Sequence, residues 1–260
     1  MILPDIDSLT NDQTAVSFFA RRMIHMDKEK NWAHIVTPES CPELDRIYGD
    51  CLQILGIKRQ KAPRLVIYES HNHIADGVLD VDLTLPTIYL SNSLVQALQP
   101  EQLSFVIGHE GGHAKFNRRQ FARLAGASGL AVFLGTVTDK WGISNKQQKF
   151  DPIRLAIIYL LLMVAARKNE YEADRCGIDI VKNPDIMQES FEKAANSDLQ
   201  KSHINNRVSP DNILAILRSV CEDIQLSIMD NVHPSDNDRL TAAARYAEKK
   251  GYIGKDAPER

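Results

Sequence analysis

The sequence contains few of the residues that mark specialised classes of protein. Four of its 260 residues are cysteine, with no CxxC pair, which argues against a disulfide-dense secreted domain and favours reduced thiols. Glycine (13) and proline (11) are too scarce for a collagenous or low-complexity chain. The formal net charge is only −3, so the chain as a whole has no charge excess that would favour nucleic acid as a partner.

A secretory leader and long apolar segments are also not found in the sequence. The first residues, MILPDIDSLTNDQ, contain no basic n-region and no apolar stretch, so we expect a cytoplasmic protein. Residues 155–166 are apolar throughout, and residues 129–137 form a shorter apolar run. A bilayer span needs about 20 residues, so we expect a buried core helix over 155–166 and no transmembrane span. Peripheral membrane contact through these two runs remains an option.

Turn residues and hydrophobic spacing predict a single α+β domain over residues 1–260, in which a small sheet packs on many helices. We expect a helical extension over residues 1–60 to precede a core over 61–250. The residues between the first two strands, including Asp76-Gly77, resemble turns. Strands are expected at 64–69, 78–83 and 87–90, and helices at 12–29, 42–55 (ended by Gly56), 100–116, from 152 past 174, 211–228 and from Ser235 to about Gly251, with a loop over 197–210.

The most informative segment runs from His109 to His113 and reads HEGGH. Residues four apart lie on one face of a helix, so both imidazoles can reach a single ion. Imidazole nitrogen is a ligand of Zn²⁺, and Glu110 can take a proton from a water that attacks a carbonyl. Gly111 and Gly112 weaken a helix by about 1 kcal/mol each. That cost makes sense if another backbone or a substrate approaches closely there.

A second pair of side chains at helical spacing follows the longer apolar run. Glu170 and Asp174 are four residues apart within the segment ARKNEYEAD, residues 166–174. A carboxylate from a second helix can complete a His₂Glu metal site, and a further carboxylate can accept the other ring N–H of a ligating histidine. We expect Glu170 in the first role and Asp174 in the second. The alternative is a solvated charged patch that includes Glu172.

Together the two segments resemble the M48 metallopeptidases, a gluzincin family that includes heat-shock and CAAX-prenyl proteases. The family pattern is HExxH followed by a segment close to SRxxEYxAD. The resemblance implies that His109, His113 and Glu170 bind one Zn²⁺ per chain. It also implies that Glu110 is the general base and that Asp174 supports a ligand. The expected fold is a mostly helical, zincin-like domain with a small β-sheet before the HExxH helix.

A third segment, VHPSDNDRL over residues 232–240, is similar to the family's HPSxxxR segment. The resemblance implies that His233 donates a hydrogen bond to the oxyanion formed during peptide hydrolysis. The alternative role of His233 is to position the helix that follows Ser235. Arg239 is expected to tie that helix to the site through a carboxylate or a carbonyl, or to form a purely structural salt bridge.

The resemblance also implies a role for the sheet. In gluzincins an extended peptide usually pairs with the edge strand before the HExxH helix, and residues 87–90 occupy that place. Residues 72–77 are loosely similar to the family's NAFAxG stretch. We do not expect His71 and His73 to form a second metal site.

These observations predict a zinc-dependent endopeptidase that acts on peptide or protein substrates. The chain departs from many relatives in having no apolar segment long enough for a membrane span, and in having Ala166 where the family has serine. Its substrate preference therefore cannot be copied from membrane-bound relatives. The alternative is a catalytically silent, zinc-stabilised gluzincin fold that acts as a binding or regulatory protein. The intact Glu110 argues against this alternative, because a structural zinc site has no use for a base.

Overall fold

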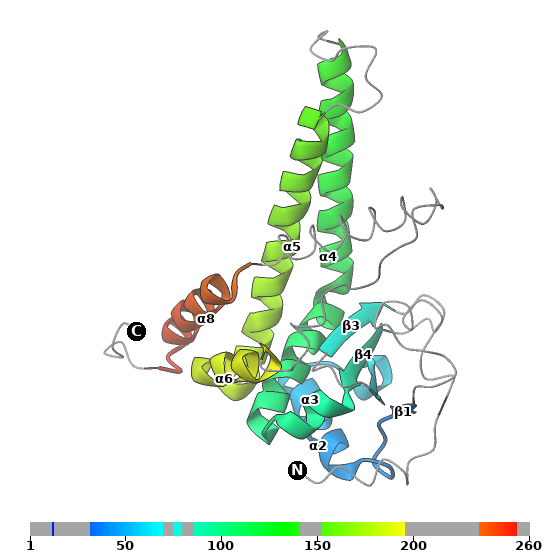
Figure 1. Ribbon diagram of the computed structural model, residues 1–260, viewed down its shortest axis with the longest axis vertical. Coiled ribbons are helices and arrows are strands. Elements are labelled where there is room, and N and C mark those ends of the chain that lie inside the picture. Colours follow the sequence, from blue (N-terminus) through cyan, green and yellow to red (C-terminus); the bar gives the residue numbers. More distant parts are fainter. Residues whose placement is uncertain are drawn as a thin grey trace, which may run out of the picture. The chain divides into compact units, whose positions relative to one another are not determined.

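The computed structural model describes residues 12, 32–69, 75–79, 86–140, 152–195 and 234–253, and it is mostly helical with a small sheet before the long helices (Figure 1). The predicted fold class is confirmed. The strands are β1 (Ala33–Ile35), β2 (Arg64–Tyr68), β3 (Ala75–Leu79) and β4 (Pro86–Ser91). The helices are α2 (Pro42–Leu55), the 3₁₀ turn η2 (Arg59–Lys61), α3 (Asn92–Ala97), α4 (Pro100–Lys140), α5 (Pro152–Val181), α6 (Pro184–Ala195) and α8 (Asp236–Lys250).

The four described strands form one mixed sheet in the order β1-β2-β4-β3. Strand β1 pairs antiparallel with β2, β2 pairs parallel with β4, and β4 pairs antiparallel with β3. The expectation that residues 87–90 form an edge strand is therefore wrong. Because β4 is paired on both sides, its residues from Thr87 to Ser91 are buried throughout, as is typical of an interior strand. Among the described strands, β3 lies at the edge next to β4.

Two strands occur where the sequence predicts them, and two differ. Strands β2 and β4 agree with the prediction within a residue or two. The strand expected at 78–83 is found at Ala75–Leu79, so the interpretation of Asp76-Gly77 as a turn is wrong. Asp76 pairs with Tyr89 and Gly77 with Ile88, because the ladder with β4 extends over these turn-prone residues. Strand β1 was not predicted, and its three residues are too few to show an alternating pattern.

The helix boundaries follow the caps in the sequence. Helix α2 ends at Gly56, whose φ of 69° lies in the left-handed region that glycine tolerates. Helices α5 and α8 begin at Pro152 and Asp236, where the sequence predicts them. Helix α4, in contrast, runs to Lys140 and does not end near residue 116. No proline interrupts the chain between Pro100 and Lys140, so the apolar run at 129–137 continues the helix.

Several predictions fall on residues outside the described ranges. They are the helices at 12–29 and 211–228, the loop at 197–210, and the histidines His71, His73 and His233. The expected burial of the run 155–166 is described only from residue 164 onward. There Ala165 is buried, but Val164 is 62% exposed. Among the described residues, no helix is long and apolar enough to cross a membrane.

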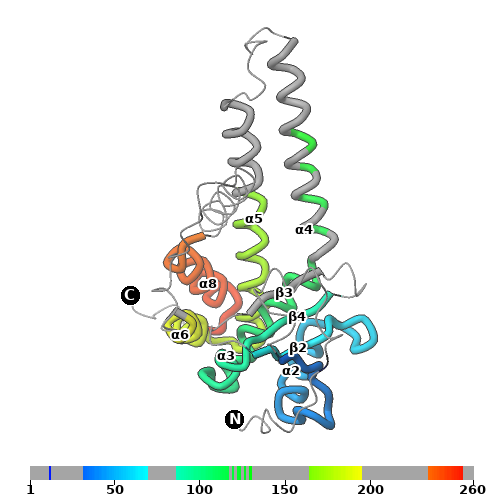
Figure 2. Tube along the Cα trace, turned by 45° about the vertical axis from the view of Figure 1, so that its right-hand side comes forward, coloured from blue at the N-terminus to red at the C-terminus, as the bar shows by residue number. Residues whose placement is uncertain are grey.

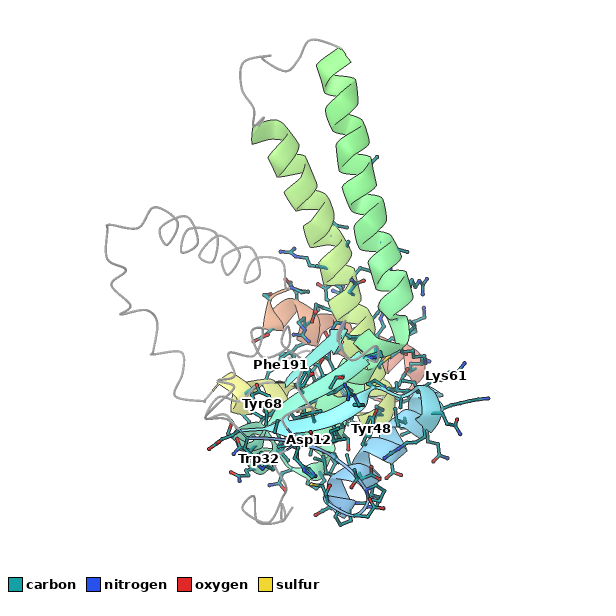
Figure 3. The ribbon with its side chains drawn as sticks, turned by 90° about the vertical axis from the view of Figure 1, so that its right-hand side faces the viewer. Asp12, Trp32, Tyr48, Lys61, Tyr68 and Phe191 are labelled. Atoms are coloured by element: carbon teal, nitrogen blue, oxygen red, sulfur yellow. The ribbon has the colours of Figure 1, made fainter. Side chains whose placement is uncertain are left out.

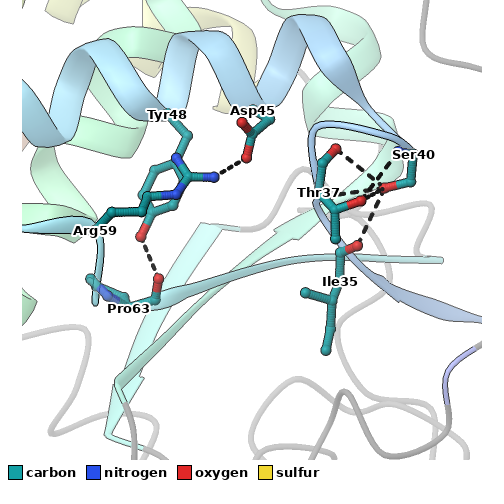
Figure 4. Close-up of polar contacts among 7 residues, drawn as sticks. All are labelled: Ile35, Thr37, Ser40, Asp45, Tyr48, Arg59 and Pro63. Atoms are coloured by element: carbon teal, nitrogen blue, oxygen red, sulfur yellow. Dashed lines mark hydrogen bonds and ion pairs between the residues drawn. The ribbon is translucent and has the colours of Figure 1, made fainter. Parts of the chain in front are cut away.

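The sheet packs on α2, α3 and the start of α4 around one hydrophobic cluster, which includes Leu44, Ile67, Ile88 and Leu103. Polar contacts fasten α2 to the beginning of β2 (Figure 4). Tyr48 donates a hydrogen bond to the Pro63 carbonyl, and Arg59 pairs with Asp45 while its guanidinium lies 5.1 Å from the Tyr48 ring. A second cluster joins α4, α5, α6 and α8 through Phe105, Ile178, Met187, Ala243 and Ala247.

By their internal contacts the residues divide into two compact units. The first unit comprises residues 1–115, 172–203 and 236–260, and the second comprises residues 116–171 and 204–235. The first contains the sheet, α2, α3, α6, α8, the beginning of α4 and the end of α5. The second contains the remaining parts of α4 and α5. The predicted extension over 1–60 and core over 61–250 stay predictions.

Candidate metal centre

The beginning of α4 is fixed before the first histidine is reached. The side-chain oxygen of Gln102 accepts a hydrogen bond from the backbone N–H of Gln99 at 2.9 Å, which satisfies a donor at the start of the helix. Leu103 and Ile107 are buried in the cluster on the sheet side. Burial of these two side chains stabilises the helix by roughly 1.5–3 kcal/mol each. The rotation of α4 about its axis is thereby set.

Helix α4 then presents His109 and His113 one turn apart. Their rings are nearly perpendicular, with centroids 4.8 Å apart, and their Nε2 atoms face each other at 3.2 Å. Donor atoms of His109, His113 and Glu170 all lie within 4.8 Å of one another. This is the group that the sequence predicts as metal ligands, and Glu170 comes from α5 as expected.

This donor set fits a zinc ion. Two nitrogens that each lie 2.0–2.1 Å from a tetrahedral zinc are about 3.3 Å apart, close to the observed separation of the two Nε2 atoms. Two imidazoles and one carboxylate also form the ligand set of catalytic zinc sites, in which a fourth position stays open. Glu170 is buried, and a buried carboxylate requires a partner of opposite charge or a hydrogen bond.

Asp174 on α5 contacts the ring nitrogen of His109 that does not face His113. Its Oδ1 accepts a hydrogen bond from Nδ1 of His109 at 2.9 Å. Arg239 on α8 donates to both carboxylate oxygens, from Nε at 2.9 Å and from Nη2 at 2.5 Å. Burial of Asp174 opposes ionisation, but the hydrogen bonds from Arg239 and His109 outweigh it and hold the pKa of the carboxyl below its usual value. An ionised Asp174 keeps the proton on Nδ1 and leaves Nε2 with a free lone pair.

Arg239 is held in turn by an aromatic side chain. Its guanidinium carbon lies 4.6 Å from the ring centroid of Phe191 on α6. Phe191 meets Phe105 edge-on at 6.2 Å, and Phe105 lies one turn before His109 on α4. A cation over an aromatic ring is stabilised by about 0.5–2 kcal/mol, depending on its exposure. Side chains from four helices therefore restrict the position of the Asp174 carboxylate and the His109 ring.

Two glycines allow α5 to approach the HExxH helix closely. A Cβ atom at Gly112 would lie 2.9 Å from the Cα of Ala173, and one at Gly108 would lie 3.1 Å from the Cα of Gly177. Both distances are too short for an ordinary contact with backbone atoms. The expectation that another backbone approaches the glycines of the motif is thus confirmed at Gly112, and the approaching backbone belongs to α5.

The sequence profile of peptidase family M48 matches residues 38–247 of the chain. The chain belongs to this family. It is an M48 metallopeptidase with a His109, His113 and Glu170 metal-binding group. No solved structure gives a significant match.

The other predicted residues of the M48 site differ in how far the structure describes them. Glu110 is buried beside His109 at 7% exposure. Asp174 and Arg239 contact each other, and of the two partners considered for Arg239 the observed one is a carboxylate. His233 lies outside the described residues, so its role in the M48 site stays a prediction.

No motif in the sequence points to two of the side chains near this M48 centre. Phe191 lies on α6, a helix for which no motif was found, and its contact with Arg239 depends on the tertiary fold. Asn169, buried beside Glu170, accepts a hydrogen bond from Arg123 at 3.0 Å. Both residues of that pair belong to the second unit. They are 46 positions apart in the sequence, so no local pattern could predict their contact.

Proposed function

We propose that the chain is an endopeptidase that uses one Zn²⁺, bound by His109, His113 and Glu170. The observation that carries this proposal is the group of two imidazoles and one carboxylate in an M48 chain. Nitrogen and carboxylate donors in this ratio suit zinc, whereas magnesium and calcium take oxygen ligands. The chemistry that zinc supplies at such a site is Lewis acidity, which lowers the pKa of water to about 7 and polarises a carbonyl.

Glu110 is proposed as the general base. Its position next to His109 on α4 brings a carboxylate beside the metal set, and the family motif has glutamate at this place. The carboxylate takes one proton from the attacking water and later gives it to the leaving amine, so that the enzyme returns to its starting protonation state. Asp174 keeps His109 oriented during these steps by accepting its Nδ1 proton.

His233 is proposed as a donor to the oxyanion, on the basis of the HPSxxxR resemblance. It precedes Pro234 and the helix α8 that carries Arg239. Removal of an oxyanion donor costs about 2.7–4 kcal/mol in the transition state. The alternative role, positioning of α8, would instead affect protein stability.

Substrates are proposed to be peptides or proteins that bind as an added strand. We assign the role expected for residues 87–90 to β3, because among the strands that the structure describes β3 is at the edge next to β4. Residues Ala75–Leu79 pair through one side with β4, and a peptide on the other side would be recognised mainly through its backbone.

Peripheral membrane contact is proposed for the apolar parts of α4 and α5. The residues between 115 and 168 include ten lysines and arginines but only two acidic residues, although the whole chain is slightly acidic. Leu130 and Val164 are exposed to 46% and 62%, and Arg167 and Lys168 are exposed next to the second apolar run. Exposed apolar side chains flanked by cations suit the surface of an anionic membrane.

A cytoplasmic location is also proposed, supported by buried free thiols at Cys41, Cys51 and Cys176.

The experiment that tests the proposed activity is cleavage of a quenched peptide library with and without a zinc chelator. We expect cleavage that the chelator abolishes and that added zinc restores. Bound zinc without any chelator-sensitive cleavage would instead support the silent, zinc-stabilised gluzincin fold.

A further inference from the structure

Helix α8 holds two carboxylates of α5, and only one of them touches the metal ligands. Asp174 is bound by Arg239 near the beginning of α8. Asp179 is bound by two tyrosines at the other end. Tyr246 donates to both oxygens of Asp179, at 2.9 and 3.0 Å, and Tyr252 donates to one of them at 3.0 Å.

The two attachment points are well separated along both helices. Asp174 and Asp179 are about 7.5 Å apart along the axis of α5, and Arg239 and Tyr246 are about 10.5 Å apart along α8 at 1.5 Å per residue. Seven residues are nearly two full turns, so Arg239 and Tyr246 lie on the same face of α8. A helix fastened at two such points can neither slide nor pivot without breaking one of them.

The fully buried apolar side chains of α8 are small. Its buried residues are the alanines Ala243, which lies between Arg239 and Tyr246, and Ala247, which directly follows Tyr246, while Leu240 and Tyr246 pack partly buried against the same cluster. An alanine contributes a single methyl group, far less than the roughly 1.5–3 kcal/mol of a buried Leu or Phe side chain. The small side chains bring α8 close to its neighbours α5 and α6, whose positions beside it Figures 1 and 2 show. The polar contacts at its two ends add to this apolar packing.

The turn after α8 places the second tyrosine. Gly251 has a φ of 73°, in the left-handed region, and its backbone N–H donates to the Glu248 carbonyl at 2.9 Å. The N–H of Tyr252 donates to the Ala247 carbonyl at 2.9 Å. These two bonds form the Schellman ending of a helix, which reverses the chain. This reversal of the chain places the Tyr252 side chain beside Asp179.

The surroundings of Tyr246 stabilise this arrangement. The guanidinium of Arg175 and the ammonium of Lys250 each lie 5.4 Å from its ring centroid. Burial, and then the hydrogen bond to Asp179, raise the pKa of the Tyr246 phenol, and the same causes raise the pKa of Tyr252. Both phenols therefore remain protonated donors at neutral pH.

We infer that Asp179, Tyr246 and Tyr252 form an anchor that positions Arg239, and through it Asp174 and His109, for zinc binding. Phe191, labelled in Figure 3, fixes the guanidinium group itself, whereas the anchor fixes the backbone from which that long side chain extends. Without the anchor α8 can pivot about its first turn, and Arg239 then leaves Asp174 for part of the time. The inference rests on the proposed function, because it takes zinc as the ion.

The test compares two sets of tyrosine variants of the full chain. Tyr246→Phe combined with Tyr252→Phe removes only the two hydroxyl groups of the anchor. Tyr48→Phe is the matched control, because it also removes a tyrosine hydrogen bond within the first unit but far along the chain from α8. Zinc affinity is measured by competition with a chromophoric chelator, and thermal unfolding of the metal-free proteins shows that each variant folds.

We expect the double variant to bind zinc about threefold to tenfold more weakly, less than the 10–100-fold loss that follows removal of a direct supporting partner. Tyr48→Phe should leave zinc affinity unchanged. Asp179→Ala should behave like the double variant, and Asp179→Asn should restore most of the affinity because its amide oxygen still accepts from both phenols. In an Arg239→Ala background the tyrosine changes should have no further effect, since neighbours that act through one residue are not additive.

Two results would overturn the inference. One is wild-type zinc affinity in the double variant, and the other is an equal loss whether or not Arg239 is present. Failure of the wild-type protein to bind zinc would overturn the proposed function and the inference with it. Normal zinc binding by the wild type with no effect of the tyrosines would overturn the inference alone.

Discussion

The two halves of α4 use the same residue type for different purposes. In the first half, Gly108 and Gly112 stand where a Cβ atom would collide with the backbone of α5. In the second half, a Cβ atom at Gly126 or Gly129 would have no neighbour within 4 Å among the described residues. Glycine beside the metal ligands thus permits close helix packing, whereas farther along the helix it only reduces helix stability.

Helix α5 shows the same contrast in the exposure of its apolar side chains. Ala173 and Ile178, near Asp174, are fully buried, whereas Val164 is 62% exposed. Among the described apolar side chains of α5, those near Asp174 are thus the more tightly packed. The exposed Leu130 and Val164, with the exposed Arg167 and Lys168, are the side chains on which the proposed membrane contact rests.

The largest effect is expected from a change at the tightly packed end. Glu110→Gln should lower kcat/KM for peptide cleavage by about 10²–10⁴-fold, because it removes the general base while keeping the shape of the side chain. Zinc binding should persist, since Glu110 is not one of the three ligands. Glu101→Gln, an exposed position in the first turn of the same helix, is the matched control. Undiminished cleavage by Glu110→Gln would disprove the assigned base.

The same substitution in the two halves of α4 should have opposite effects on stability. Gly112→Ala introduces a methyl group against the Ala173 backbone and should destabilise the fold by about 1–3 kcal/mol. Gly129→Ala should stabilise it by about 0.5–1 kcal/mol, because it has room and improves helix propensity. Urea unfolding of both variants measures the two free energies. If both substitutions changed the free energy of unfolding in the same direction, the contrast between the two halves of α4 would be wrong.

A smaller effect is expected for membrane binding. Lys168→Gln should weaken binding to vesicles that contain phosphatidylserine by about 1 kcal/mol, or about fivefold. Lys61→Gln, an exposed lysine of the first unit, should change binding little. Vesicle co-sedimentation measures both, with pure phosphatidylcholine as the uncharged reference. Equal losses for the two variants, or no binding by the wild type, would contradict a docking surface on the second unit.

The metal centre could be predicted from the sequence because its residues follow local helical spacing. His109 and His113 are four apart, as are Glu170 and Asp174, so each pair shares a helix face whatever the tertiary fold. The pairing of Arg239 with Asp174 was one of several alternatives, since the distance in sequence leaves the partner open. Which partner Arg239 contacts depends on how α8 packs against α5. That packing depends on residues that belong to no recognisable motif.

The sheet shows what local pattern cannot specify. Residues 87–90 were correctly predicted as a strand but wrongly placed at an edge, because sequence order does not give strand order. Strands β2 and β4 pair in parallel, and the intervening β3 then pairs on the far side of β4. Asp76 and Gly77 favour turns in isolation, but here the hydrogen bonds of the ladder decide their conformation.

The most direct test of the central claim is the zinc content of the purified protein, measured by atomic emission after gel filtration. The wild type should hold about one zinc per chain, and His109→Ala combined with His113→Ala should hold almost none. An equal zinc content in the two proteins would contradict the assignment of these histidines as ligands, and a wild type that binds no zinc would contradict the proposed function itself.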